Sequence, residues 1–189
     1  MTRFAPPSPQ LTLRVVILAV ALLLPSFVAQ QAEATIYAVQ VGATKPVLDD
    51  GKTSEGYGVD IAGRIGFQVP IPLFDLELEG LLGLNTYNLD GAALTQTMRA
   101  GVGLRGGANL ALYPHGFVHV SYGRQFNAAV GSPSGALVDV GLAFDLTALP
   151  YVRIGVYGAY NHLIHSESSK VGDGDGQWLS FGVQGAFVN

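Results

Sequence analysis

The stretch TMRAGVGLRGGANLALYP, residues 97–114, alternates between two kinds of side chain. One parity is mostly apolar and contains Met98, Ala100, Val102, Leu104, Ala108, Leu110 and Leu112. The other parity is polar or small and contains Thr97, Arg99, Gly101, Gly103, Arg105, Gly107 and Asn109. Successive side chains of a β-strand point to opposite faces, so this period of two predicts a strand with one apolar and one polar face.

The composition narrows the class of protein. The 189 residues are 49% hydrophobic but only 13% charged, and 25 of them are glycine. Soluble domains carry about 25% charged residues, so this balance is unusual for one. The chain has no cysteine, which excludes disulfides and cysteine-ligated zinc. With a formal net charge of −4 and no basic cluster, we expect no nucleic-acid partner.

Residues 1–34 have the features of a secretory signal peptide. Arg3 and Arg14 supply positive charge, VVILAVALLLP (15–25) is a short apolar core, and Ala32 and Ala34 are small residues at the cleavage positions. The apolar run is shorter than the ~20 residues of a membrane-spanning helix. We expect cleavage after Ala34, export, and one mature domain over residues 35–189.

The same two-faced pattern recurs along the mature chain. It appears in residues 35–43, 56–69, 73–84, the quoted stretch, 117–126, 137–146, 151–161 and 178–188. Short proline-bearing turns (PIP, YPHG and ALP) alternate with long polar connections at 44–55, 85–96, 127–135 and 164–176. Such alternation, with an even number of ~10-residue strands, is typical of outer-membrane barrels. We predict an all-β fold: an eight-stranded antiparallel up-and-down transmembrane β-barrel.

The size of an eight-stranded barrel indicates which face is inside. Such a barrel holds little more than its own side chains, or one small ligand. The polar face is rich in glycine and alanine, whereas the apolar face carries bulky leucine, valine, isoleucine and phenylalanine. We therefore expect the apolar face to contact lipid. The alternative is a soluble lipocalin-like binder with the apolar face inward.

Aromatic residues near both ends of the strands predict two belts at the bilayer interfaces. Near the short turns these are Phe67, Phe74, Tyr113, Phe117, Phe144, Tyr151 and Phe187. Near the long connections they are Tyr57, Tyr87, Tyr122, Phe126, Tyr160 and Trp178.

Charged residues on the polar face predict a charge network in the lumen. Its members are Asp60, Arg64, Asp75, Glu77, Glu79, Arg99, Arg105, Asp139, Asp145 and Arg153. If stagger is ignored, the middle layer is Arg64, Arg105, Glu77, Glu79 and Asp139, and the lower layer is Arg153, Asp145, Asp75 and His119. Charges buried in so narrow a space must pair. They could form an ionic gate or a plug of salt bridges, and the narrow lumen favours the plug. His115 is expected in a turn.

The chain resembles the small outer-membrane β-barrels of OmpA-barrel and OmpX type. The resemblance rests on the signal peptide, the eight amphipathic strands, the proline turns and the terminal SFGVQGAF. Ser180, Gly182 and Phe187 match the sense of that family's C-terminal assembly signal, although Gly185 stands where a hydrophobic residue is usual. The resemblance implies assembly by the outer-membrane insertion machinery. It also implies contact with outer-membrane lipid and lipopolysaccharide.

Two further motifs contain residues of the types found in catalytic and metal sites. The segment NHLIHSES places His165, Ser166 and Glu167 together, and lipid A deacylases are small barrels that use histidine, serine and an acid. The His-x-Ser spacing of those enzymes is absent here, so the lipid-modifying enzyme stays an alternative. The segment GDGDG (172–176) could bind calcium through Asp173 and Asp175, but it lacks the further carboxylates of a full site.

The sequence thus predicts a monomeric barrel of the bacterial outer membrane without cofactor, metal or catalytic site. Its expected role is structural or surface-interacting: envelope integrity, adhesion or binding through the long connections. A narrow or gated pore for small solutes or ions, a lipid A deacylase-type enzyme and the lipocalin-like binder are the alternatives.

Overall fold

The structure is a computed structural model. It describes residues 34–47, 56–71, 73–88, 94–108, 110, 112–127, 134–165 and 176–189. The predicted signal peptide, apart from Ala34, lies outside the described residues. Within them, no helix is long and apolar enough to cross a membrane.

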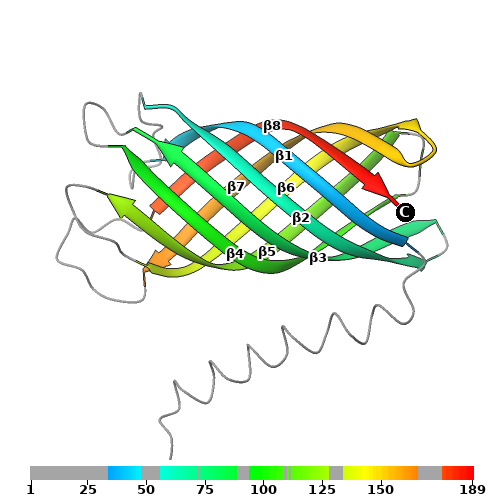
Figure 1. Cartoon of the computed structure of the whole chain (residues 1–189), viewed down its shortest axis with the longest axis horizontal. Coiled ribbons are helices and arrows are strands. Elements are labelled where there is room, and N and C mark those ends of the chain that lie inside the picture. Colours follow the sequence, from blue (N-terminus) through cyan, green and yellow to red (C-terminus); the bar gives the residue numbers. More distant parts are fainter. Residues whose placement is uncertain are drawn as a thin grey trace, which may run out of the picture.

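Eight antiparallel strands close into one barrel in the order β1 to β8 (Figure 1). The strands are β1 Ala34–Val47, β2 Gly58–Ile71, β3 Phe74–Tyr87, β4 Thr95–Ala108, β5 Leu112–Asn127, β6 Ser134–Leu149, β7 Val152–His165 and β8 Gly176–Val188. Each strand pairs with its two neighbours, and β1 closes the ring by pairing with β8. The predicted eight-stranded, all-antiparallel fold is confirmed. The strands are longer than the segments read from the sequence because several extend into the polar flanks.

Side chains alternate across the barrel wall as the sequence predicts. In β4, the side chain of Arg99 is inside and 4% exposed, whereas Val102 is outside and 46% exposed. The outer wall is apolar on all strands, with Val39, Ile61, Leu82, Val120, Leu142, Val156 and Val183 among its exposed residues. The lipocalin-like alternative required the opposite orientation and is wrong. A wall of this kind needs an apolar surrounding to be stable.

Glycine on the inner face lets neighbouring strands curve tightly into the ring. A Cβ atom added at Gly101 would lie 2.5 Å from the Cα atom of Ser121 on β5. Real side chains do not tolerate so close a contact with backbone. The inner glycines are therefore a requirement of closure, whereas at Gly185 on the outer face an added Cβ would meet no heavy atom within 4 Å.

The short connection between β4 and β5 differs from the prediction. β4 ends at Ala108 and β5 begins at Leu112, so the YPHG segment expected as the turn belongs to β5. Pro114 is tolerated because it pairs only with Phe144 on β6, one residue beyond the last β4–β5 pair, Gly107 with His115. His115 is consequently not in a turn. Its side chain is inside the lumen and 4% exposed.

The aromatic belts are only partly as predicted. Tyr113 and Phe117 near the short turns, and Tyr87 and Trp178 near the long connections, point into the lumen and are buried. Parity explains the difference, because each of these residues shares its strand face with the polar residues. Other members of the predicted belts are exposed on the outer wall, among them Tyr57, Tyr122, Phe144 and Tyr151.

Substitution of two glycines on opposite faces tests the closure argument. Gly101→Ala should lower the free energy of unfolding by ~2 kcal/mol or more, in the range of overpacked sites, because Cβ meets backbone. Gly185→Ala should change it by no more than ~1 kcal/mol, since the site is open. Urea unfolding in lipid vesicles, followed by the fluorescence of the single tryptophan, measures both. Equal effects of the two variants would contradict the argument.

Candidate functional site

The carboxylate of Glu79 is the centre of the middle layer of the lumen. Its Oε2 atom lies 2.6 Å from Nη1 of Arg64, and its Oε1 atom lies 3.2 Å from Nε of Arg105 and 2.7 Å from Nε2 of His119. Glu79 is paired in register with Gly66 on β2 and Gly103 on β4. Glycine on both neighbouring strands leaves room for the two long arginine side chains to reach it.

Arg99 organises the layer nearer the long connections. Its Nη2 atom donates to Asp60 at 3.0 Å, and its Nη1 atom donates to Asp139 at 3.3 Å and to Asn161 at 2.8 Å. The hydroxyl of Tyr157 donates to Asp60 at 3.3 Å. One guanidinium from β4 thus links β2, β6 and β7 across the lumen, which ties distant parts of the ring together.

Arg153 occupies the layer nearest the short turns. Its Nη1 atom lies 2.9 Å from Oε1 of Glu77, its Nη2 atom lies 4.0 Å from Oδ2 of Asp75, and its guanidinium lies 4.8 Å from the ring centroid of Tyr113. Its side chain is 15% exposed, more than the other lumen arginines.

The remaining lumen acid, Asp145, connects this end to the middle layer. Its Oδ1 atom accepts a hydrogen bond from Nε2 of Gln184 at 2.6 Å, and its Oδ2 atom lies 3.9 Å from Nε2 of His115. The same imidazole nitrogen contacts Nη1 of Arg105. His115 is therefore part of the polar interior, a residue that the sequence reading assigned to a turn.

Two residues lie at another depth than predicted without stagger, and a third, Glu77, joins two layers because it lies 2.9 Å from Arg153 and 3.7 Å from Arg105. Asp139 was expected in the middle layer but pairs with Arg99 nearer the long connections, and His119 was expected lower but binds Glu79. Strands of a closed barrel tilt, so residues equally far from the turns on different strands lie at different heights. The parity of a residue predicts whether its side chain faces the lumen or the outer wall. Its depth along the barrel axis can be assigned only when the stagger of the strands is known.

An apolar layer that the sequence reading missed fills the lumen close to the long connections. Tyr87, Leu137, Leu163 and Trp178 pack together, and the last three are 0% exposed. The rings of Tyr87 and Trp178 lie 6.0 Å apart, and Gln125 donates a hydrogen bond to the Tyr87 hydroxyl at 2.8 Å. Residue parity could have predicted that these side chains face the lumen. Leu137 lies on the same strand face as Asp139, and Trp178 lies on the same strand face as Ser180.

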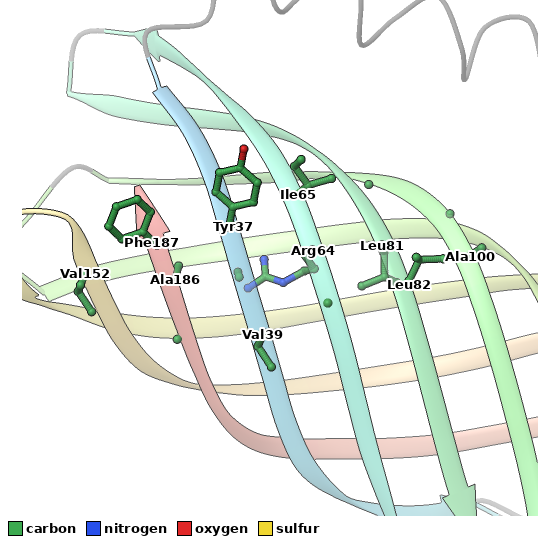
Figure 2. Close-up of a pocket in the computed structure, with 15 residues that line it drawn as sticks. Tyr37, Val39, Arg64, Ile65, Leu81, Leu82, Ala100, Val152, Ala186 and Phe187 are labelled. Carbon is green, nitrogen blue, oxygen red and sulfur yellow. The ribbon is translucent and has the colours of Figure 1, made fainter. Parts of the chain in front are cut away.

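A shallow apolar groove of about 860 Å³ lies on the outer wall over β8, β1, β2 and β3 (Figure 2). Around it are Tyr37, Val39, Ile65, Leu82 and Phe187. Outward-facing Gly63, Gly80 and Gly185 keep its floor low. Figure 2 also shows Arg64 extending from β2 toward β1, and its Nη2 atom donates to Gln184 on β8 at 3.1 Å. Arg64 also lines the groove but is only 7% exposed, so the groove surface is formed mainly by apolar side chains and glycine.

The assembly-signal residues occupy both faces of β8. Ser180 is buried, Gly182 pairs in register with Gly42 on β1, and Phe187 is 47% exposed. Of the enzyme candidate, the backbone of His165 pairs with Gly135, whereas Ser166 and Glu167 lie outside the described residues. So do Asp173 and Asp175. Among the residues that the structure describes, no group of three or more histidines and acids could hold a metal ion.

Comparison with known proteins identifies the fold. No family model and no curated protein sequence matches the chain. The chain is similar to the crystal structure of Neisserial surface protein A (12% identity, TM-score 0.54), covering 82% of this chain and 96% of that one. It is also similar to Ail, the attachment invasion locus protein of Yersinia pestis (10% identity, TM-score 0.52), covering 82% and 98%. The chain thus has the fold of the small eight-stranded outer-membrane β-barrels.

Removal of the central carboxylate tests the role of the charge network in stability. Glu79→Ala leaves Arg64, Arg105 and His119 around an empty position and should lower the free energy of unfolding by ~3–5 kcal/mol, as for a broken buried ion pair. The control Gln96→Ala changes an exposed side chain outside the charge network and should cost about 0.5 kcal/mol or less. Urea titration in vesicles compares the two. A smaller loss for Glu79→Ala than for Gln96→Ala would contradict the network described above.

Proposed function

We propose that this chain is a protein of the bacterial outer membrane with a structural or surface-interaction role. A single observation carries the proposal: the lumen is filled by paired charges and an apolar layer, while the outer wall is apolar. A barrel of this kind has little interior to offer a solute. Its distinctive surface is the end of the barrel from which the four long connections extend.

Three observations support the location in the outer membrane. The apolar outer wall would be unstable in water, and the closed ring leaves no unpaired sheet edge for lipid to contact. The first 34 residues have the features of an export signal. The similar solved structures are small eight-stranded outer-membrane barrels. In the proposed orientation the short turns and the C-terminus face the periplasm, and the long connections face outward.

The names of the similar structures agree with a role at the surface. One is called a surface protein and the other an attachment invasion locus protein. At 10–12% identity, the similarity supports a shared fold but gives no information about a shared ligand. The proposal for this chain is therefore envelope integrity, adhesion or binding through the long connections at 44–55, 85–96, 127–135 and 164–176. We expect assembly by the outer-membrane insertion machinery and a monomeric state.

A conducting pore is the less favoured alternative because two barriers lie in series. The apolar layer around Trp178 blocks the end near the long connections, and the ion pairs of Glu79 and Arg99 fill the lumen below it. An enzyme of lipid A deacylase type would need a base, a nucleophile and an acid in hydrogen-bond contact. That hypothesis rests on His165, Ser166 and Glu167 and is tested by His165→Ala and the acylation state of lipid A.

The location is tested by expression in a Gram-negative host. The mature chain should fractionate with the outer membrane and migrate differently on gels when unheated and boiled, because a closed barrel resists detergent. External protease should cleave only within the long connections. A freely soluble chain without a heat-dependent shift would contradict the proposal.

The closed lumen is tested by conductance in planar lipid bilayers. The wild-type barrel should show no sustained open level. Trp178→Gly should stay non-conducting as well, because the ion pairs of Glu79 and Arg99 remain in the lumen. Stable ion conduction by the wild type would favour the pore instead.

A further inference from the structure

The charges on the outer wall have an uneven distribution. Within the described ranges, every aspartate and glutamate faces the lumen, as do four of the arginines, Arg64, Arg99, Arg105 and Arg153. The charged residues on the outer wall there are Lys45 and Arg124. Both are cations, and the lumen pairs do not involve either of them. The stability of the interior therefore does not account for their charge.

Both cations are close to the long connections. Lys45 lies two positions before the end of β1, and Arg124 lies three positions before the end of β5. Each is paired in register with an exposed apolar residue of the wall, Lys45 with Leu179 and Arg124 with Met98. The charged heads thus belong to the edge of the apolar band, where long basic side chains reach from hydrocarbon toward polar headgroups.

Each cation also rests on an exposed aromatic ring. Nζ of Lys45 lies 4.3 Å from the ring centroid of Tyr57 and 3.2 Å from its hydroxyl. Cζ of Arg124 lies 5.2 Å from the ring centroid of Phe126. Contact with a ring limits the positions of a long side chain while its N–H groups stay available at the edge. The same cation–aromatic arrangement therefore occurs twice, on strands four positions apart in the ring.

We propose that Lys45 with Tyr57, and Arg124 with Phe126, form two separate sites for phosphate-bearing lipid headgroups in the leaflet around the long connections. The proposal rests on the membrane location given above. The two sites lie on opposite sides of an eight-stranded ring, so each binds its own lipid. Arg124 can present two parallel N–H groups to phosphate oxygens, whereas Lys45 acts as a point charge. Carboxylates, which would repel phosphate, are absent from the described outer wall.

Energy transfer from the single tryptophan tests the proposal. Trp178 is paired in register with Pro46, next to Lys45, so it reports on lipid close to that site. The folded full-length mature barrel is placed in phosphatidylcholine vesicles containing either pyrene-labelled phosphatidylglycerol or pyrene-labelled phosphatidylcholine. The wild type should accumulate the anionic probe over the zwitterionic one, and 0.5 M NaCl should weaken this preference.

Variants assign the preference to the two cations. Lys45→Gln should reduce the preference for the anionic lipid about fivefold at its site, the factor expected for one basic residue at an anionic surface. Because Arg124 lies on β5, across the ring from Lys45 on β1, its site is tested in the double variant by the amount of phosphatidylglycerol that co-purifies. The control Ile164→Ala changes an exposed uncharged residue near the same end, on β7, and should have no effect.

The outcome separates this proposal from the membrane location. Equal probe preference and equal co-purified phosphatidylglycerol in the wild type and the double variant would overturn the headgroup sites. The gel shift and protease pattern of the wild type test the location independently. A variant that loses the gel shift is replaced by Lys45→Met or Arg124→Met, which keep the side-chain length.

Discussion

The narrowness of a ring of eight strands is the constraint on which the rest of the structure depends. At this width the strands curve so tightly that an inner Cβ at Gly101 would meet the backbone of β5. The inner face therefore carries many glycine and alanine residues between its polar side chains and holds only a limited number of bulky apolar residues, such as those around Trp178. Most of the bulky aliphatic residues form the outer wall. The same constraint that selects glycine inside thus selects an apolar surface outside, and with it a lipid environment.

Confinement also determines the chemistry of the interior. A charge in the lumen has no bulk solvent to stabilise it, so it must find partners on other strands. Glu79 binds two arginines and a histidine, and Arg99 bridges three strands. These contacts join strands that are far apart in sequence and favour one register of closure. The apolar layer around Trp178 adds a second set of contacts inside the ring.

The sequence was sufficient to predict the fold and the face of the barrel wall on which each residue lies. It was not sufficient to predict how far along the barrel axis each residue lies. Period-two alternation and inner glycine were sufficient to predict eight strands and to place Arg99 and Arg105 inside. The partners of Asp139 and His119 were not predictable, because they depend on strand stagger. Pro114 was read as a turn residue, although it sits in β5 where its missing N–H is tolerated. The layer of Leu137, Leu163 and Trp178 was missed because aromatic and apolar residues near strand ends suggest an outer belt.

The absence of cysteine allows a direct measurement of which face contacts lipid. Single cysteines are introduced as Val102→Cys on the outer wall and Ser121→Cys in the lumen, and the folded barrels are placed in vesicles. Val102→Cys should react with a lipid-soluble maleimide and not with a water-soluble one. Ser121→Cys should react with neither until urea unfolds the chain. Reaction of folded Val102→Cys with the water-soluble reagent, or of folded Ser121→Cys with the lipid-soluble one, would contradict the account.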